Sequence, residues 1–229
     1  MLAHLLELRQ RTLYVVFWFF CLFFLFFLKA GDLYHLFVYP LAHLLPQQQG
    51  LIATQITSPL FTPLKLATDA ALFLTLPFAL YQIWRFISPG LYKKEQQQIR
   101  GLVTLSMALF IVGIVFCFYL VLPFMFQLFI SALPKGVRLM PDMTNTIDFI
   151  THMLTLFGLC FQIPLICLIL ARIQLVNVET LKKIRPYMIV LAFILGMLLT
   201  PPDVLSQLML AIPLCLLYEL GILLAFYLA

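Results

Sequence analysis

The chain has 229 residues, of which 64% are hydrophobic and only 10% charged, with a mean hydropathy of +1.08 and a formal net charge of +5. This composition excludes a soluble globular protein and indicates an integral membrane protein with a single helical domain, residues 1–229. The sequence contains no nucleotide-binding loop, nucleophile elbow or CxxC pair, and its cysteines lie in apolar runs where packing is their expected role. We therefore expect no enzymatic activity, no cofactor, no metal site and no binding of nucleic acid.

Six stretches of the chain are predicted to be transmembrane helices. The first is rich in Phe and Leu and is followed by no small-residue cleavage site, so we expect it to be retained. Pro77, Pro164 and Pro213 fall inside the second, fourth and sixth stretches, where each is expected to kink its helix within a curved, concave all-α bundle. In chain order the stretches are about 13–28, 66–87, 102–122, 149–171, 187–199 and 205–228.

The last two stretches are separated by Thr200-Pro201-Pro202-Asp203. Two adjacent prolines cannot continue a helix, and Asp203 is a good N-cap for the helix that follows. The stretch before this break, Tyr187–Leu199, reaches only about 20 Å as a helix, which is less than the roughly 30 Å of the hydrocarbon core. The sequence therefore predicts an unusually short fifth helix joined to the sixth by a tight hairpin.

The basic residues predict the orientation of the bundle. With a cytoplasmic N-terminus, the cytoplasmic segments carry ten of the 14 lysines and arginines, so the positive-inside rule places both termini in the cytoplasm. The two long external loops, residues 29–65 and 123–148, are then expected to form a cap over the opposite face. The first loop includes an apolar run, Leu33–Tyr39, that suits a short interfacial helix.

Glu7 and Glu95 are the main acids of the predicted cytoplasmic face, which is otherwise basic. Carboxylates in such a setting suit a cationic ligand, above all a guanidinium group, which a carboxylate engages through two parallel hydrogen bonds. Phe86 is close enough in sequence to Glu95 to add stacking or cation–π contact. The alternative is that Glu7 forms only a surface ion pair with Arg11, four residues later, and that Glu95 is a solvated loop acid.

Several polar residues lie within or beside the predicted spans. Glu219, in the sixth span, is a functional candidate because acids inside a membrane are costly, although it could instead lie close enough to the cytoplasmic interface to hydrate. Gln162 is expected to bond the carbonyl that a nearby proline leaves free. Met197, Thr200 and Gln207 cluster at the external ends of the last two spans, where they could bond a partner helix or be satisfied within the bundle.

Six motifs in order resemble those of the TatC family, the multispanning core of the twin-arginine (Sec-independent) protein translocase, and the resemblance runs from His4 to nearly the last residue. Singly each motif is weak, but all six on a six-span chain are highly specific. They are His4-Leu5-x-Glu7-Leu8-Arg9-x-Arg11, Ser58-Pro59-x-Phe61-x-Pro63, Phe86-Ile87-Ser88-Pro89-Gly90-Leu91-Tyr92-x-x-Glu95, Lys183-x-Arg185-Pro186-Tyr187, Leu199-Thr200-Pro201-Pro202-Asp203-x-x-Ser206-Gln207, and Ala211-Ile212-Pro213-x-x-x-Leu217-Tyr218-Glu219-x-Gly221.

The resemblance implies a receptor for folded proteins that carry twin-arginine signal peptides, located in a bacterial plasma membrane and driven by the proton-motive force. Glu7 and Glu95 match the carboxylates that bind the arginine pair, with Arg9, Phe86 and Leu91 in the same cytoplasmic patch.

Other matched positions concern assembly and transport. Met197, Thr200 and Gln207 match the polar site where the single-span partners TatB and TatA dock, and other copies of the chain are further expected partners. The assembly and transport positions are Pro40, Asp203, Glu219 and Gln162. At Gln162 this chain departs from the family, which commonly has a glutamate there, so an obligatory protonation at this position is in doubt.

Two other classes of membrane protein compete with this interpretation. Kinked helices and Glu219 would suit an ion-coupled small-molecule secondary transporter, but the sequence shows no inverted repeat and no central ladder of charges. An anchor subunit of a redox enzyme would need histidine pairs within the spans, and the sequence lacks them.

Overall fold

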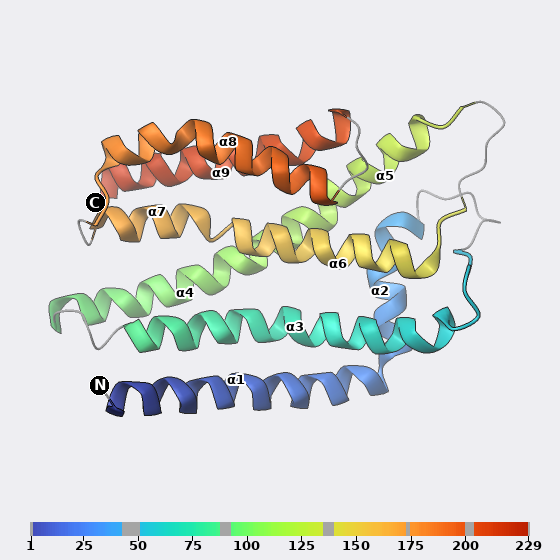
Figure 1. Cartoon of the computed structure of the whole chain (residues 1–229), viewed down its shortest axis with the longest axis horizontal. Helices are drawn as coiled ribbons and strands as arrows, with labels where there is room; N and C mark the ends of the chain where they lie inside the picture. The colour runs from blue at the N-terminus through green and yellow to red at the C-terminus, as the bar shows by residue number, and fades with distance from the viewer. Residues whose placement is uncertain are drawn as a thin grey trace. The chain divides into compact units, whose positions relative to one another are not determined.

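The computed structural model describes residues 2–42, 51–87, 93–134, 140–172, 175–199 and 204–228. These residues are almost entirely helical (Figure 1). The chain divides into two compact units, the first formed by Met1–Ala108 with Met140–Thr151, and the second by Leu109–Leu139 with His152–Ala229.

The first unit is built on helices α1 (Leu2–Leu28), α2 (Ala30–Ala42) and α3 (Ser58–Ile87), together with the start of α4 (Lys93–Phe116). Helices α1 and α3 lie side by side (Figure 1). They run antiparallel, because Arg11 bonds Gln82 whereas Trp18, further along α1, packs on Phe78, earlier in α3, with 5.5 Å between ring centroids. This packing places the beginning of α1 beside the end of α3.

A network of hydrogen bonds, which we call the clasp, joins Ile52 and Thr54 to Asp142. The Ile52 N–H donates to the Pro141 carbonyl at 3.0 Å, and the Met143 N–H donates to the Ile52 carbonyl at 2.8 Å. The Asp142 carboxylate accepts from the Thr54 hydroxyl at 2.7 Å and from the Thr54 N–H at 3.1 Å. It also accepts from the Asn145 N–H at 3.1 Å, and so caps α6 (Met143–Cys160).

The clasp predicts a pH-dependent stability. Its hydrogen bonds, that of the Thr54 side chain first, hold the pKa of Asp142 below its ordinary value. Such a carboxylate contributes stability that is complete above its unfolded pKa of about 4 and is lost as the pH falls through the lower folded pKa. We expect Asp142→Ala to lower the unfolding temperature by about 2–4 °C at pH 7, and by less at pH 3. Thermal unfolding of the detergent-solubilised protein at both pH values measures this, and an equal deficit at both would contradict it.

The second unit contains the rest of α4, a π-helical turn η2 (Cys117–Val121) and α5 (Leu122–Ser131). It also contains the end of α6 and helices α7 (Ile163–Arg172), α8 (Val178–Leu199) and α9 (Val204–Leu228). Helix α9 packs against both α7 and α8. A buried cluster joins these three helices, and its members are Cys167, Leu181, Tyr218, Ile222 and Ala225.

Two glycines allow close helix contacts within this second unit. A Cβ on Gly113 of α4 would lie 2.8 Å from the Phe157 carbonyl oxygen in α6. A Cβ on Gly221 of α9 would lie 3.0 Å from the Pro164 Cα in α7. Both positions need glycine because the facing atoms belong to backbone, which cannot move aside as a flexible side chain can.

Five helical runs among the described residues are long and apolar enough to cross a membrane. The predicted fifth span, Tyr187–Leu199, is not among them, because it forms only the apolar end of the 22-residue α8, whose first turns are rich in charge. The prediction of an unusually short fifth helix was therefore wrong, because α8 begins at Val178, nine residues before the apolar stretch that predicted it. Only its apolar part is short, and six crossings stay a prediction. The five runs are Leu6–Leu28, Ser58–Ile83, Thr104–Ser131, Met143–Arg172 and Gln207–Tyr227.

Several predicted helix boundaries were wrong. Helices α1, α3 and α4 begin at Leu2, Ser58 and Lys93, about ten residues before the apolar stretches that predicted them. Hydropathy finds only the apolar part of a helix, whereas Glu, Gln and Arg are good helix formers that extend α1 and α4 beyond it. In α3 the early start agrees with Pro59, which is favourable in the first turn of a helix. Within residues 29–65 the predicted short helix is confirmed as α2, which extends beyond the apolar run 33–39, while its position at the membrane interface stays a prediction.

The second loop predicted to be external, residues 123–148, was also predicted too long. Helix α5 occupies residues 122–131 and continues α4 without a gap through η2, so the helical run of the third span extends to Ser131. Pro123 cannot donate a backbone hydrogen bond to the preceding turn, and the π-helical turn lies directly before it. The fourth span is broken at Phe161–Gln162 into α6 and α7 rather than kinked, because Pro164 cannot donate to the carbonyl four residues earlier. Around Pro77 and Pro213 the helices α3 and α9 continue. The Pro201-Pro202 hairpin lies outside the described residues.

Candidate functional site

Glu7 in α1 already binds a guanidinium group in this structure. Its Oε1 accepts from Arg11 Nε at 3.1 Å and from Arg11 Nη2, in an ion pair one helical turn long. The remaining arm of the guanidinium, Arg11 Nη1, donates at 3.3 Å to Oε1 of Gln82, a buried residue of α3. The Glu7 side chain stays 38% exposed, so a ligand can reach it.

The other residues predicted to form this patch are placed less fully. Arg9 is exposed on α1. Among the described residues, the side chain that bonds Glu7 and Gln82 is that of Arg11 and not that of Arg9. Phe86 lies in the last turn of α3 and Glu95 in the first turn of α4, both within the first unit, but their side chains are outside the described set. Leu91 lies outside the described residues altogether.

The predicted partner-docking residues lie where α8 ends and α9 begins. Met197 is 66% exposed near the end of α8, and Gln207 is half-buried in the first turn of α9. A Cβ on Gly196 would lie 3.5 Å from the Gln207 carbonyl oxygen, so the two helix ends are in contact. Thr200 and Asp203, between these ends, are outside the described residues.

At the other end of the same helix pair, Glu219 is joined to Arg185. Arg185 Nη2 donates to Glu219 Oε2 at 2.7 Å, and both side chains are about two-fifths exposed. One residue earlier in α9, the Tyr218 hydroxyl donates to the Leu181 carbonyl oxygen at 2.8 Å. Glu219 thus bonds within the unit and keeps part of its side chain exposed, and whether it lies within the membrane or at the interface stays a prediction.

Because the Arg185–Glu219 pair is half-exposed, we expect its removal to change little. Glu219→Gln is expected to lower the free energy of unfolding by less than about 1 kcal/mol. A double-mutant cycle with Arg185→Gln, followed by denaturant unfolding in detergent, measures the coupling. A coupling much larger than this would contradict the expectation.

The last two predicted positions lie in different units. Gln162 is buried, with 5% exposure, at the break between α6 and α7, and it makes contacts there. Its own backbone carbonyl accepts from the Ile166 N–H at 2.9 Å and so starts α7. Pro40 lies in α2, in the first unit, and its side chain is not among those described.

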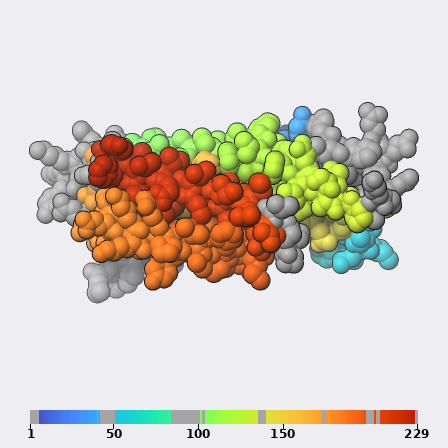
Figure 2. Space-filling view, turned by 90° about the horizontal axis from the view of Figure 1, so that it is seen from above, coloured from blue at the N-terminus to red at the C-terminus, as the bar shows by residue number. Residues whose placement is uncertain are grey.

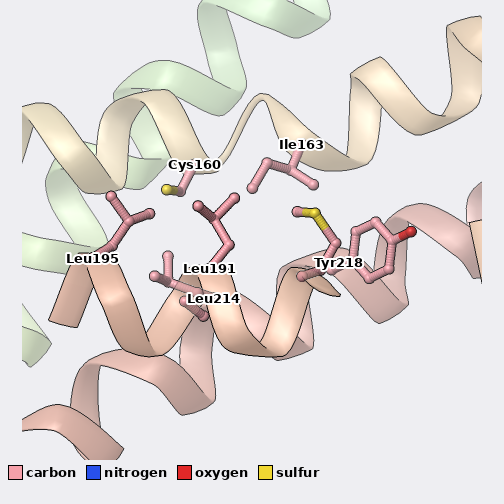
Figure 3. Close-up of a pocket in the computed structure, with 8 residues that line it drawn as sticks. Cys160, Ile163, Leu191, Leu195, Leu214 and Tyr218 are labelled. Carbon is pink, nitrogen blue, oxygen red and sulfur yellow. The ribbon is translucent and has the colours of Figure 1, made fainter. Parts of the chain in front are cut away.

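Beside this break, a small apolar pocket opens between α6, α7, α8 and α9. Cys160 and Ile163 line it from either side of the break, Leu191 and Leu195 from α8, and Leu214 and Tyr218 from α9 (Figure 3). The lining is almost wholly apolar, which suits helix packing rather than a polar ligand.

Gln82, Arg185 and the clasp were not predicted from the sequence. Gln82 is one of few amides in an apolar stretch, and its position could have suggested a buried partner. The register of the hairpin gave a signal for Arg185, since Arg185 and Glu219 lie at equal distances from Pro202. The clasp joins residues 88 apart and had no such signal.

Comparison with known proteins finds one family over almost the whole chain. The family model described as Sec-independent protein translocase protein (TatC) matches residues 3–213. Proteins named Sec-independent protein translocase protein TatC are similar to it. That of Haemophilus influenzae is 42% identical over 98% of this chain and 88% of its own length. That of Escherichia coli K12 is 40% identical over 97% of this chain and 86% of its own length.

A solved structure shares the fold. A crystal structure described as the twin-arginine translocase receptor TatC matches with a TM-score of 0.88 and 31% sequence identity, over 97% of this chain and 98% of that one. The sequence comparison and the structure comparison thus point to the same family over nearly the full length of the chain.

Proposed function

This chain belongs to the TatC family of Sec-independent protein translocase proteins, and from its site we propose how it recognises cargo. As a multi-pass membrane protein it is a core component of the translocase. We propose that Glu7 and Glu95 bind the two guanidinium groups of a twin-arginine signal peptide, with Arg9, Phe86 and Leu91 around them.

The bond between Glu7 and Arg11 is the observation that carries this proposal. It supports the view that the carboxylate can present its oxygen to the Nε–Nη edge of an arginine, the geometry in which arginine is recognised most strongly. Lysine offers no such planar fork, so this geometry favours arginine over lysine.

The further parts of the proposal follow the family. Met197, Thr200 and Gln207 receive the single-span helices of TatB and TatA, and the exposure of Met197 supports this. Pro40, Asp203, Gln162 and Glu219 serve assembly and transport, together with other copies of the chain. Six spans hold both termini in the cytoplasm, in a bacterial plasma membrane. The protein is not an enzyme, and the proton-motive force drives export. The secondary-transporter alternative has no support among the relatives.

Photo-crosslinking of a signal peptide tests the proposal. A twin-arginine peptide should crosslink to a probe beside Glu95, and its Lys-Lys version should crosslink far less. Equal crosslinking of the two peptides would refute recognition by paired carboxylates. Co-purification of single-span partners from membranes tests the docking site separately.

Arg11 occupies part of the proposed site, so its removal is informative. A helical ion pair at this spacing is worth only about 0.3–0.5 kcal/mol, and an incoming arginine can therefore displace it. We expect Arg11→Gln to tighten binding of a twin-arginine peptide by about two- to threefold, measured by fluorescence titration. A strong loss of binding in this variant would instead mean that Arg11 holds Glu7 in position.

A further inference from the structure

One face of α8 carries a cation and a phenol at one end and apolar side chains beyond them. Lys183 and Tyr187 are four residues apart on this continuous helix and both are exposed, Tyr187 at 74%. Val190, Ile194 and Leu198 continue the same face and are also exposed. We call these five residues the α8 stripe. Helix α8 lies at the surface of the second unit, beside α9 (Figure 2).

The boundary between water and lipid falls at the Lys183 end of the stripe. Arg185 and the two lysines before it give way here to an uncharged run. Pro186 lies inside the helix and cannot donate to the Lys182 carbonyl, which therefore needs water or another donor. Tyrosine is enriched at this depth, where its ring lies in the interface and its hydroxyl reaches the headgroups. Tyr187 thus lies at headgroup level.

The apolar part of the stripe has the length of one leaflet. From Tyr187 to Leu198 a helix rises about 16 Å, and half of the hydrocarbon core is about 15 Å. A single acyl chain can therefore lie along Val190, Ile194 and Leu198 while its headgroup remains beside Lys183.

The two neighbouring lysines differ in what they face. Lys182 points to α9, where its ammonium lies 5.5 Å from the centroid of the Phe226 ring. Lys183 forms no ion pair within the described part of the chain, although Glu179 precedes it by one turn on the same helix. The Lys183 ammonium is therefore the one directed toward a ligand on the stripe.

We propose that the α8 stripe binds an anionic phospholipid. Its phosphate bonds the Lys183 ammonium and the Tyr187 hydroxyl, and one acyl chain lies on Val190, Ile194 and Leu198. Charge complementarity selects this occupant, since a basic group at the membrane surface attracts anionic lipid. The inference rests on the proposed crossing of the membrane by α8 and is independent of peptide recognition by Glu7 and Glu95.

Native mass spectrometry of the full-length protein, titrated with phosphatidylglycerol or phosphatidylcholine, tests this. Lys183→Gln should weaken phosphatidylglycerol binding about fivefold, the effect of one basic residue at a membrane surface. Lys182→Gln removes the same charge one position away and should change phosphatidylglycerol binding by less than about twofold. Phosphatidylcholine should bind weakly to every variant.

Equal losses in the two lysine variants, or equal binding of the two lipids, would overturn the site. Glu179→Gln is the control for misfolding. Removing this acid should strengthen phosphatidylglycerol binding, and a damaged fold could not produce such a gain. Unchanged or weaker binding in Glu179→Gln would also count against the proposal. A signal-peptide titration of each variant shows whether peptide recognition survives separately.

Discussion

Glu7→Gln is expected to weaken binding of a twin-arginine signal peptide by about 10- to 100-fold. The substitution keeps the shape of the side chain but removes the charge, and a hydrogen bond to a charged group is worth about 1.5–3 kcal/mol. Glu95→Gln should have an effect of the same size, because each carboxylate is proposed to bind one arginine. Titration of a labelled peptide against the purified protein in detergent measures both.

The exposed acid Glu179 provides the matched control. Glu179→Gln removes the same charge from a basic region outside the proposed site and should leave peptide affinity within about twofold. If all three variants weaken binding equally, the peptide responds to overall charge and not to a site. If Glu7→Gln and Glu95→Gln fail to fold, the two acids are structural.

Gly113→Leu is expected to cause the largest loss of stability, about 3 kcal/mol or more. Even a Cβ at this position would lie 2.8 Å from the Phe157 carbonyl oxygen and 2.9 Å from the Phe161 ring. The longer side chain has to separate α4 from α6, and overpacking of this kind costs about 1–3 kcal/mol even in cores that can adjust. Gly113→Ala should show a smaller effect of the same sign. Denaturant unfolding in detergent measures the series.

Gly101 of the same helix is the control, because a Cβ there would meet nothing within 4 Å. Gly101→Leu should be neutral or stabilising by up to about 1 kcal/mol, since leucine has the higher helix propensity. Similar losses at both glycines would show that α4 resists leucine for a reason other than its contact with α6.

The sequence predicted the apolar part of each helix because burial in lipid leaves a strong signal, as in the Phe-rich α1. It did not predict where helices end, since the polar turns that open α1 and α4 have helix propensity but no hydropathy signal. Glu7 was found through its motif, and its contact with Arg11 through their spacing.

Contacts between distant segments could be predicted only where the chain reverses tightly. A hairpin centred on Pro202, as the sequence predicts, would bring Arg185 near Glu219 and Gly196 near Gln207 by register alone, and both contacts are present. No comparable register relates Thr54 to Asp142 or Lys65 to Asp148. Long segments separate the members of each pair, and the sequence does not predict the path that these segments take. Gln82 was missed because an amide in an apolar stretch does not reveal its partner.

The clasp has a consequence for the order in which the protein is made. Helices α1 and α3 can pack as soon as both have left the ribosome, but Thr54 must wait for Asp142, 88 residues later. The first unit is therefore completed only after α4 and α5 have been synthesised, because residues 140–151 belong to it. A nascent chain arrested before Asp142 would hold α1 and α3 together while Thr54 still lacked its partner, and the segment before α3 would be open to proteases in that state.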